Sequence, residues 1–411
     1  MKVAIVGAGQ FGRSFAALWQ LHPDVGEVYV TDVLAERAQE YQRQYHLAGA
    51  FDTFDEVLGS DVDAVAIFTQ RWTHGQMALA ALQAGKHVYS SVPMGIEAAE
   101  IEAIVAQVAR GEQIYMMGET SYYNPAVWWA RERVAAGEMG RVFYAEGDYV
   151  HDMDNGFYAA YAYSGGQDWK RSASFPPMLY PTHAVGGVLG ALPTYATSVS
   201  CLGVVDDRDD GVFDKSVSMF DNDFSNMSAH FELANGGVMR TNEFRRVGHP
   251  AGVHESRFRF YGTDEVMEQT STGASLSTRD DIEDISALFR THAGQVPQPE
   301  LAGIDDALRQ SFSSGTAPVQ DRSRLPAQFD GAPTATRALT TSWPMTSCRR
   351  CAPVPIPRSM PGPRPGSRCR GSPRGSLHAT TAYGYRCWTW ARRRAAEPTA
   401  GAARAESCRG C

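Results

Sequence analysis

The chain has 411 residues, of which 43% are hydrophobic and 20% are charged, a balance typical of a soluble globular enzyme with two or three domains. Its formal charge of −8 argues against a nucleic-acid partner. No run of residues reaches the ~18 consecutive apolar positions of a membrane helix, so we expect no membrane partner either.

The first segment predicts a dinucleotide-binding loop. An apolar run over residues 2–6 ends in the sequence GAGQFG at 7–12, and apolar residues then recur at helical spacing. A second apolar run over 28–30 ends at Asp32, 20 residues beyond Gly12. A G-x-G-x-x-G loop between a strand and a helix, with an acid at the end of the next strand, is the context of the dinucleotide fingerprint.

The residue types in this loop suit the chemistry of NAD. Gly7 permits a tight turn, Gly9 lets the backbone approach the pyrophosphate, and Gly12 lets the helix pack closely on the strand. Asp32 accepts hydrogen bonds from the ribose hydroxyls and repels a 2′-phosphate, which favours NAD over NADP. The alternative is a glycine-rich turn that binds nothing. We therefore predict NAD as the cofactor, in contact with Gly7, Gly9, Gln10, Phe11, Gly12 and Asp32.

Further strands and helices alternate as far as residue 122. We predict strands over 62–68, 86–89 and 113–117 and a helix over 76–84. Strands that alternate with helices form a parallel, doubly wound sheet, so residues 1–122 are expected to be an α/β Rossmann domain that binds NAD.

These segments resemble the GFO/IDH/MocA family of NAD(P)-dependent sugar oxidoreductases. The resemblance extends over about residues 1–330 and rests on DAVAIFTQ at 63–70, His74, AGKHV at 84–88 and Val92-Pro93. It implies that Thr69 and His74 lie near the nicotinamide or its ribose. The predicted cofactor contacts from this resemblance are Thr69, Trp72, His74, Val92 and Pro93.

One position departs from the family pattern. The usual Glu-Lys-Pro of the family is Ser91-Val92-Pro93 here, and in the dehydrogenases that Lys helps to move the proton of the oxidised hydroxyl. Val92 has no titratable group. Either another base serves in this chain, or its chemistry differs from that of an ordinary dehydrogenase.

Residues 123–332 are expected to form a second, α+β domain with a mainly antiparallel open sheet that covers the nicotinamide edge of the first. Its predicted elements are a helix over 124–137, strands over 141–149 and 257–261, and a hairpin with strands 227–233 and 238–244. We interpret 152–176 and 202–226 as long loops. The acidic stretch 206–223 is interpreted as a solvated surface loop rather than a metal site.

The second domain also indicates one branch of the family. Residues 178–187, MLYPTHAVGG, together with Glu119, EGDYVHD at 146–152 and the Val-Pro pair, are similar to the NAD-dependent α-N-acetylgalactosaminidases and their relatives. That branch carries a Glu where Ser91 stands, and the wider family carries an Asp where Leu179 stands. The match is therefore partial and does not identify the sugar.

The candidate catalytic residues follow from the need for a base beside the alcohol. An imidazole suits that role because its pKa lies near the working pH, and we favour His183, with a core histidine as the alternative. Tyr149 and His151, two apart on an extended segment, face the same side and are expected to hold sugar hydroxyls, unless they are an ordinary strand end. Glu119 is expected to assist proton transfer or to bind a hydroxyl, with a salt bridge as the alternative. Lys170 is a candidate replacement for the missing Lys.

Three functions stay open. The first is an NAD-linked oxidoreductase that acts on a secondary alcohol carbon of a sugar or sugar derivative. The second, implied by the branch, is a redox-neutral glycosidase that retains NAD: the C3 hydroxyl is oxidised, the C2 proton is lost, the glycosidic group is eliminated, water adds and the hydride returns. The third is a catalytically silent NAD-binding regulator. The resemblance also implies a homo-oligomer, a dimer or tetramer, if the C-terminus is intact.

The last 79 residues, 333–411, differ sharply from the rest. They contain 14 Arg, two Glu and no Lys or Asp, a net charge of +12, whereas the preceding 332 residues carry −20. A basic arm for nucleic acid and a zinc site at Cys348 and Cys351 are two interpretations. We favour a third, out-of-frame translation, because a GC-rich gene encodes this composition in the wrong frame.

The cysteines support that division of the chain. Cys348 and Cys351 lack a convincing second pair, so we predict no metal site. Six of the seven cysteines lie in the tail, which leaves Cys201 as the one cysteine of the preceding residues. That usage predicts a cytoplasmic protein without a disulfide framework.

Overall fold

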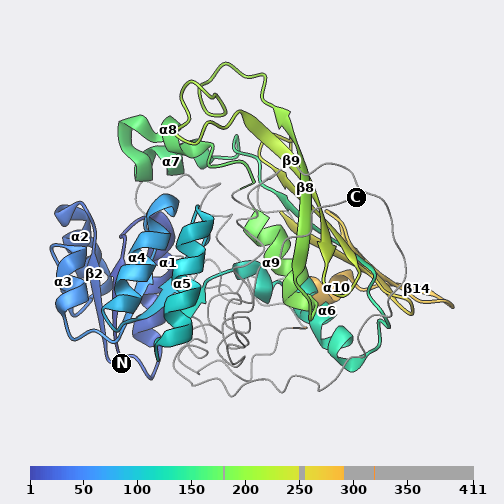
Figure 1. Ribbon diagram of the computed structural model, residues 1–411, viewed down its shortest axis with the longest axis horizontal. Helices are drawn as coiled ribbons and strands as arrows, with labels where there is room; N and C mark the ends of the chain where they lie inside the picture. The colour runs from blue at the N-terminus through green and yellow to red at the C-terminus, as the bar shows by residue number, and fades with distance from the viewer. Residues whose placement is uncertain (179–180, 250–254, 291–318, 320–411) are drawn as a thin grey trace, which may run out of the picture.

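The computed structural model describes residues 1–178, 181–249, 255–290 and 319. The described chain is built on two sheets, one formed by the blue and cyan part of the chain and the other mainly by its green and yellow part (Figure 1). Residues 333–411 lie outside the described residues, so their out-of-frame origin stays a prediction.

The first sheet has six parallel strands in the order β3-β2-β1-β4-β5-β6, which confirms the predicted Rossmann fold. Alternate residues of its central strand enter different cores. Val3 and Ile5 pack on the side of α1, whereas Ala4 and Val6 pack on the side of α4 and α5. A parallel strand buried on both faces reads as a continuous apolar run, as it does in this sequence. The elements are β1 Lys2–Val6, α1 Gln10–Leu21, β2 Glu27–Thr31, α2 Ala35–Tyr45, β3 Gly49–Ala50, α3 Phe54–Gly59, β4 Ala64–Ile67, η1 Arg71–Thr73, α4 His74–Gln83, β5 His87–Ser90, α5 Ala98–Arg110 and β6 Tyr115–Met117.

The second sheet has eight strands in the order β14-β13-β12-β11-β7-β10-β9-β8. Every pair in it is antiparallel except β7 with β10, so the expectation of a mainly antiparallel sheet is confirmed. The predicted hairpin is β9–β10, with Gly236 at a φ of +77° in its turn. The elements are η2 Thr120–Tyr123, α6 Pro125–Ala136, β7 Tyr144–Val150, α7 Phe157–Gly165, η3 Gly166–Asp168, α8 Trp169–Ala173, α9 Pro181–Ala191, β8 Ala196–Val205, β9 Phe224–Leu233, β10 Val238–Phe244, β11 Ser256–Tyr261, β12 Val266–Gln269, β13 Ala274–Ser277, β14 Ile282–Asp284 and α10 Ser286–Phe289.

Two stretches interpreted as long loops contain regular structure, so that part of the prediction was wrong. Residues 152–176 include α7, η3 and α8, and 202–226 begin in β8 and end in β9. The sequence of α7, FYAAYAYSG, distributes tyrosine and alanine around the helix and lacks the apolar stripe by which a helix is recognised in a sequence.

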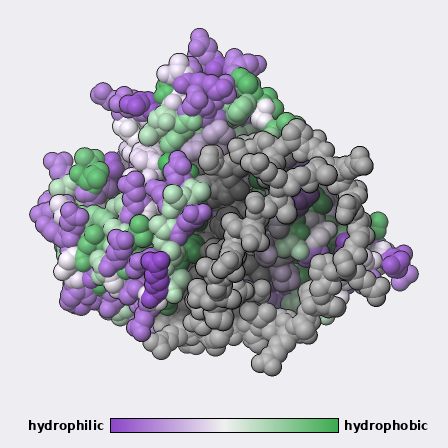
Figure 2. All heavy atoms as spheres, viewed as in Figure 1, coloured by the Kyte–Doolittle hydropathy of each residue, from purple (hydrophilic) through white to green (hydrophobic). Residues whose placement is uncertain are grey.

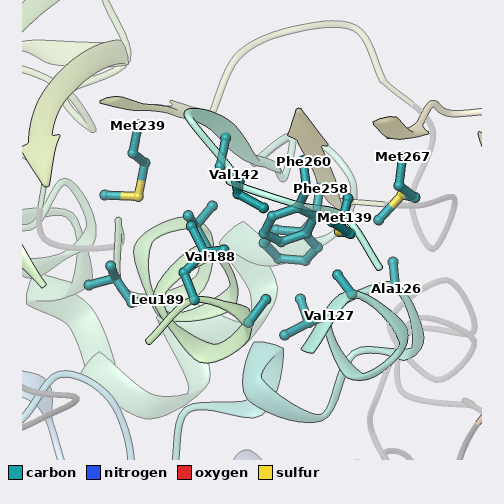
Figure 3. Packing of buried hydrophobic residues seen from close by; sticks show 14 of the residues in the cluster. Ala126, Val127, Met139, Val142, Val188, Leu189, Met239, Phe258, Phe260 and Met267 are labelled. Carbon is teal, nitrogen blue, oxygen red and sulfur yellow. The ribbon is translucent and has the colours of Figure 1, made fainter. Parts of the chain in front are cut away.

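Helix α9 lies directly on one face of the second sheet. A Cβ atom on Gly147 of β7 would lie 2.5 Å from the carbonyl oxygen of Ala184, and one on Gly187 would overlap the ring of Phe258. Small residues on both elements therefore let the helix backbone approach the strand. Around this contact, Val188 of α9 packs with Phe258 and Phe260 in the core (Figure 3). The start of α9 is thereby fixed against β7, which places His183 beside that strand.

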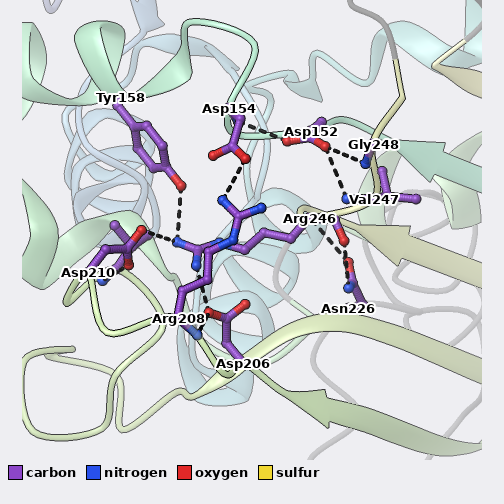
Figure 4. Close-up of polar contacts among 11 residues, drawn as sticks. Asp152, Asp154, Tyr158, Asp206, Arg208, Asp210, Asn226, Arg246, Val247 and Gly248 are labelled. Carbon is purple, nitrogen blue, oxygen red and sulfur yellow. Dashed lines mark hydrogen bonds and ion pairs between the residues drawn. The ribbon is translucent and has the colours of Figure 1, made fainter.

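A buried arginine joins α7 to the end of β10 and to the acidic stretch. The side chain of Arg246 is 4% exposed and forms ion pairs with Asp206 at 2.6 Å and Asp210 at 2.7 Å. It also donates to the hydroxyl of Tyr158 at 3.0 Å (Figure 4). Asp152 accepts hydrogen bonds from the backbone N–H groups of residues 247 and 248. The acidic stretch is therefore in part a partner for buried charge, and not only a solvated loop.

Hydrophilic side chains cover much of the visible described surface, with hydrophobic ones in small separate groups (Figure 2). Within the described ranges, no helix has both the length and the apolar character needed to cross a bilayer. The same residues contain no group of three or more His, Cys, Asp or Glu side chains arranged to hold a metal ion.

Candidate functional site

The glycine-rich loop has the geometry of a phosphate cradle. Gly7 has a φ of +97°, and a Cβ there would lie 2.8 Å from the carbonyl oxygen of Phe68. A Cβ on Gly12 would lie 2.8 Å from the carbonyl oxygen of Gly7, whereas one on Gly9 would have no atom within 4 Å. Gly9 precedes the first residue of α1, Gln10, so open space lies at the start of a helix, where N–H groups bind phosphate.

Asp32 is held at the end of β2, beside that loop. Its Oδ2 accepts a hydrogen bond from the N–H of Ala8 at 2.8 Å, and its Oδ1 accepts one from the N–H of Leu34 at 3.0 Å. The remaining lone pairs of the carboxylate suit ribose hydroxyls. Phe11 is placed differently, because its ring packs on Phe15 and Phe68, with centroids 5.2 and 5.9 Å away. Its ring therefore belongs to the packing beneath the loop.

His74 joins the ends of β4 and β5 from within the protein. It is 1% exposed, with Nδ1 2.9 Å from the carbonyl oxygen of Pro93 and Nε2 3.1 Å from that of Thr69. Burial lowers the pKa of His74 to about 4, so the ring is neutral at pH 7. The neutral ring carries one N–H, which donates to one of these two carbonyl oxygens, and the hydroxyl oxygen of Ser91 lies 3.4 Å from Nε2. These contacts link the segments that follow β4 and β5, so His74 has a structural role. Its proximity to the nicotinamide stays a prediction.

The other predicted cofactor residues lie at the same edge of the sheet. The Thr69 hydroxyl is 2.7 Å from that of Thr73, and the Trp72 ring lies 6.0 Å from the ring of Phe220 in the second part of the chain. Val92, 9% exposed, precedes Pro93 through a cis peptide bond. The carboxyl ends of β1, β4 and β5 thus meet at one edge, the place where open α/β sheets bind ligands.

Glu119 and His183 form a carboxyl–imidazole pair between the two sheets. Glu119 follows β6 and its side chain is fully buried, while His183 lies in the first turn of α9. Oε1 of Glu119 accepts hydrogen bonds from Nδ1 of His183 at 2.8 Å and from the N–H of Ser121 at 2.8 Å. Because Nδ1 donates, Nε2 carries the lone pair that a general base needs. Oε2 of Glu119 is buried without a hydrogen-bond partner in the described part of the chain, and a ligand hydroxyl could supply one.

Tyr149 connects this pair to His151. Its ring lies 4.6 Å from the ring of His183, and its hydroxyl forms a hydrogen bond with Nδ1 of His151. Burial, reinforced by nearby Arg245 and His183, lowers the pKa of His151 well below its usual range, so its ring is neutral. The structure thus brings together four of the five candidate catalytic residues, Glu119, Tyr149, His151 and His183.

Lys170 lies elsewhere. It is exposed on α8, and its ammonium group donates to the carbonyl oxygen of Asp210 at 2.7 Å. No contact joins it to the group around His183 in the described structure, so this geometry gives no support to Lys170 as the replacement base.

Two charged residues beside the site were absent from the sequence-based prediction. The guanidinium carbon of Arg245 lies 5.1 Å from the centroid of the Tyr149 ring, and its Nε donates to Glu243 at 3.1 Å. Both side chains are 4% exposed. The parallel pairing of β10 with β7 sets Glu243 opposite Tyr149, and only the alternation of charge at the end of a predicted strand could have indicated it.

Comparison with known proteins agrees with this reading of the first sheet. Residues 1–119 match the GFO/IDH/MocA family model, described as an oxidoreductase family with an NAD-binding Rossmann fold. The chain is 30% identical over 140 residues to 4-carboxy-2-hydroxymuconate-6-semialdehyde dehydrogenase of Sphingobium sp., a match that covers 34% of this chain and 44% of that protein. It is 28% identical over 200 residues to a glycosyl hydrolase family 109 protein of Saccharopolyspora erythraea, with 46% and 43% covered. The chain therefore spans less than half the length of these curated relatives.

Solved structures share the fold over a larger part of the chain. Levoglucosan dehydrogenase, in a complex with NADH and levoglucosan, matches with a TM-score of 0.58 and 17% identity over 83% of this chain and 96% of that one. The scyllo-inositol dehydrogenase of Lactobacillus casei, with bound NAD(H) and scyllo-inositol, matches with a TM-score of 0.55 and 18% identity over 69% and 81%. At these identities the likeness establishes the fold alone.

Proposed function

We propose that the chain is an NAD-dependent enzyme acting on a secondary alcohol carbon of a sugar or sugar derivative, because residues 1–119 match the NAD-binding Rossmann family model of the GFO/IDH/MocA oxidoreductases. The observation that carries the proposal is the Glu119–His183 pair, a carboxyl–imidazole pair that lies between the second sheet and the carboxyl edge of the Rossmann sheet.

The residues present fit the cofactor. Open space above Gly9, at the start of α1, suits the pyrophosphate, and a side chain there would fill it. Asp32 suits the ribose hydroxyls, and Thr69 and Trp72 are proposed to lie near the nicotinamide end. When bound, NAD⁺ supplies the hydride acceptor for the alcohol carbon.

The protein's own groups would handle the proton and hold the sugar. We assign to His183 Nε2 the removal of the hydroxyl proton, a contribution of roughly 10²–10⁴-fold for a well-placed base. Glu119, 2.8 Å from Nδ1, then faces the imidazolium that forms and stabilises its charge. We assign to Tyr149, which is hydrogen-bonded to His151, a contact with a sugar hydroxyl. Val92 needs no proton-transfer role in this scheme.

A second candidate function is glycoside cleavage without net formation of NADH. The specific observation in its favour is that the site holds two separate imidazoles, one paired with Glu119 and one with Tyr149, where an ordinary dehydrogenase of the family relies on Lys. The similarity to glycosyl hydrolase family 109 proteins supports the same candidate. A silent NAD-binding regulator is the remaining alternative.

Simultaneous measurement of NADH and released aglycone over a panel of sugars and aryl glycosides separates these functions. NADH formation indicates a dehydrogenase, aglycone release without NADH indicates the glycosidase, and NAD binding with neither product refutes the enzymatic proposal. His183→Ala is expected to abolish turnover and to leave NAD affinity unchanged. His230→Ala, an exposed histidine of β9, is the matched control and should keep full activity. Undiminished turnover in His183→Ala would remove His183 from the role of base.

Two expectations accompany the proposal. A cytoplasmic location is supported by the single cysteine, Cys201, among the first 332 residues. A homo-oligomer, dimer or tetramer, is proposed from the family resemblance, and sedimentation of the purified chain would test it.

A further inference from the structure

The adenosine end of the dinucleotide fingerprint is bordered by residues from both parts of the chain. Asp32 marks the ribose end, and the guanidinium of Arg37, in the first turn of α2, lies 3.9 Å from its Oδ1. The guanidinium carbon of Arg37 also lies 4.9 Å from the centroid of the Tyr163 ring, which belongs to α7. An aromatic ring of the second part therefore reaches the edge of the Rossmann part at the residue that reads the ribose.

We propose that Arg37 and Tyr163 form a binding site for the adenosine half of NAD, with the adenine ring stacked on this cation–aromatic pair. Val33 and Leu34, which directly follow Asp32, are 98% and 52% exposed. They offer apolar surface to the same ligand. Purine rings stack on aromatic and guanidinium planes, so this set of side chains suits adenine chemically. The inference rests on the proposed use of NAD and adds a contribution from the second part of the chain.

The position of Tyr163 is fixed by contacts that α7 makes with η1, at the end of β4. The side-chain amide of Gln70 donates to the carbonyl oxygen of Ser164 at 3.0 Å. The guanidinium carbon of Arg71 lies 5.2 Å from the ring centroid of Tyr161 and 4.0 Å from that of Phe175. The consecutive residues Gln70 and Arg71, at the start of η1, thus hold α7 against the carboxyl edge of the sheet, so Tyr163 needs little rearrangement to meet a ligand there.

The start of α7 also has fixed partners. Tyr158, in its first turn, receives the hydrogen bond from buried Arg246, which is itself paired with Asp206 and Asp210 (Figure 4). Both ends of α7 therefore have fixed partners: Arg246 with the acidic stretch at one end, and Gln70 at the other. Tyr163 is 46% exposed, so it retains surface for a ligand.

A cofactor contact from α7 has a kinetic consequence. NAD held at Asp32 and at Tyr163 bridges the two parts of the chain, and its release requires the adenine to leave the stacked pair. We therefore expect slow release, which suits an enzyme that keeps NAD between turnovers.

The test is to measure binding of NAD, ADP-ribose and nicotinamide mononucleotide to the full chain by calorimetry. Tyr163→Ala should weaken NAD and ADP-ribose about tenfold, the scale of one lost aromatic–base stack, and should leave nicotinamide mononucleotide unchanged because that ligand has no adenine. Tyr163→Phe keeps the ring and should bind all three ligands like the wild type. Arg37→Gln should weaken the two adenine-containing ligands without affecting the third.

Two outcomes would overturn the inference: wild-type affinity of Tyr163→Ala for NAD and ADP-ribose, or an equal loss for nicotinamide mononucleotide. Thermal unfolding of each variant separates a lost contact from a damaged fold, and Arg37→Gln provides an independent test from the other part of the chain. Failure of the proposed enzymatic function is distinguishable, because a protein without turnover on any sugar would still show the adenine-dependent effect of Tyr163→Ala.

Discussion

Replacing Gly147 with alanine tests whether the close packing of α9 on the second sheet determines the position of His183 in the site. The new Cβ would lie 2.5 Å from the carbonyl oxygen of Ala184, and ordinary contact begins at 3.4 Å, so α9 must move by about 0.9 Å. His183 precedes Ala184 and would be carried away from Glu119 and Tyr149. A displacement of about 1 Å costs roughly 10²-fold in a positioned catalytic group, so kcat should fall by about 10- to 100-fold.

The same substitution should also lower the free energy of unfolding by about 1–3 kcal/mol, the range for overpacking a core. Turnover of the substrate selected from the panel, thermal unfolding and NAD affinity would be measured together. NAD affinity should not change, because the loop at Gly7 lies in the other sheet. Gly59→Ala is the control, since a Cβ there meets no atom within 4 Å. An unchanged kcat in a clearly destabilised Gly147→Ala protein would refute the assigned role of His183.

Three further predictions follow from the site. Gly9→Ala should keep the stability of the wild type and lose NAD affinity, because its Cβ would enter open space. Gly7→Ala should unfold at lower temperature because Gly7 has a φ of +97°. Loss of stability in both variants would contradict the assignment of this loop as the phosphate-binding site. Glu119→Gln keeps the shape of the side chain but removes its charge. Turnover should fall by roughly 5- to 30-fold, because charge-assisted hydrogen bonds are about twice as strong as neutral ones. Turnover equal to that of the wild type would exclude a role for the charge. Since the pKa of His74 is lowered to about 4 in the folded protein and is about 6.5 when unfolded, its contribution to stability is complete above pH ~6.5 and is lost as the pH falls toward 4, by about 3 kcal/mol. Urea unfolding of the wild type and His74→Asn between pH 7 and 4 should show a smaller pH dependence in the variant, and parallel curves would contradict that pKa.

Local patterns made the first sheet predictable. The loop at Gly7 and the acid at Asp32 are separated by one strand–helix–strand unit, and each is recognisable from its neighbours in the chain. The antiparallel hairpin β9–β10 was predictable for the same reason, because its turn is short.

The surroundings of the site depend on contacts between distant residues, which one sequence does not reveal. The parallel pairing of β10 with β7 brings Glu243 and Arg245 next to Tyr149, although about 94 residues of chain separate them. No local sequence pattern predicts that pairing. The alanine- and tyrosine-rich α7 lacks an apolar stripe, so a helix that contacts both parts was interpreted as a loop. Lys170 was chosen for its chemistry alone, and the structure holds it at Asp210.

The most direct test of the central claim is the absorbance of the bound nicotinamide when NAD⁺-loaded protein is mixed with the sugar or glycoside panel in a stopped-flow experiment. We expect at least one carbohydrate to reduce the cofactor, transiently or permanently, and we expect His183→Ala to abolish the signal while His230→Ala preserves it. Full occupancy by NAD⁺ with no reduction by any carbohydrate, or an undiminished signal in His183→Ala, would contradict it.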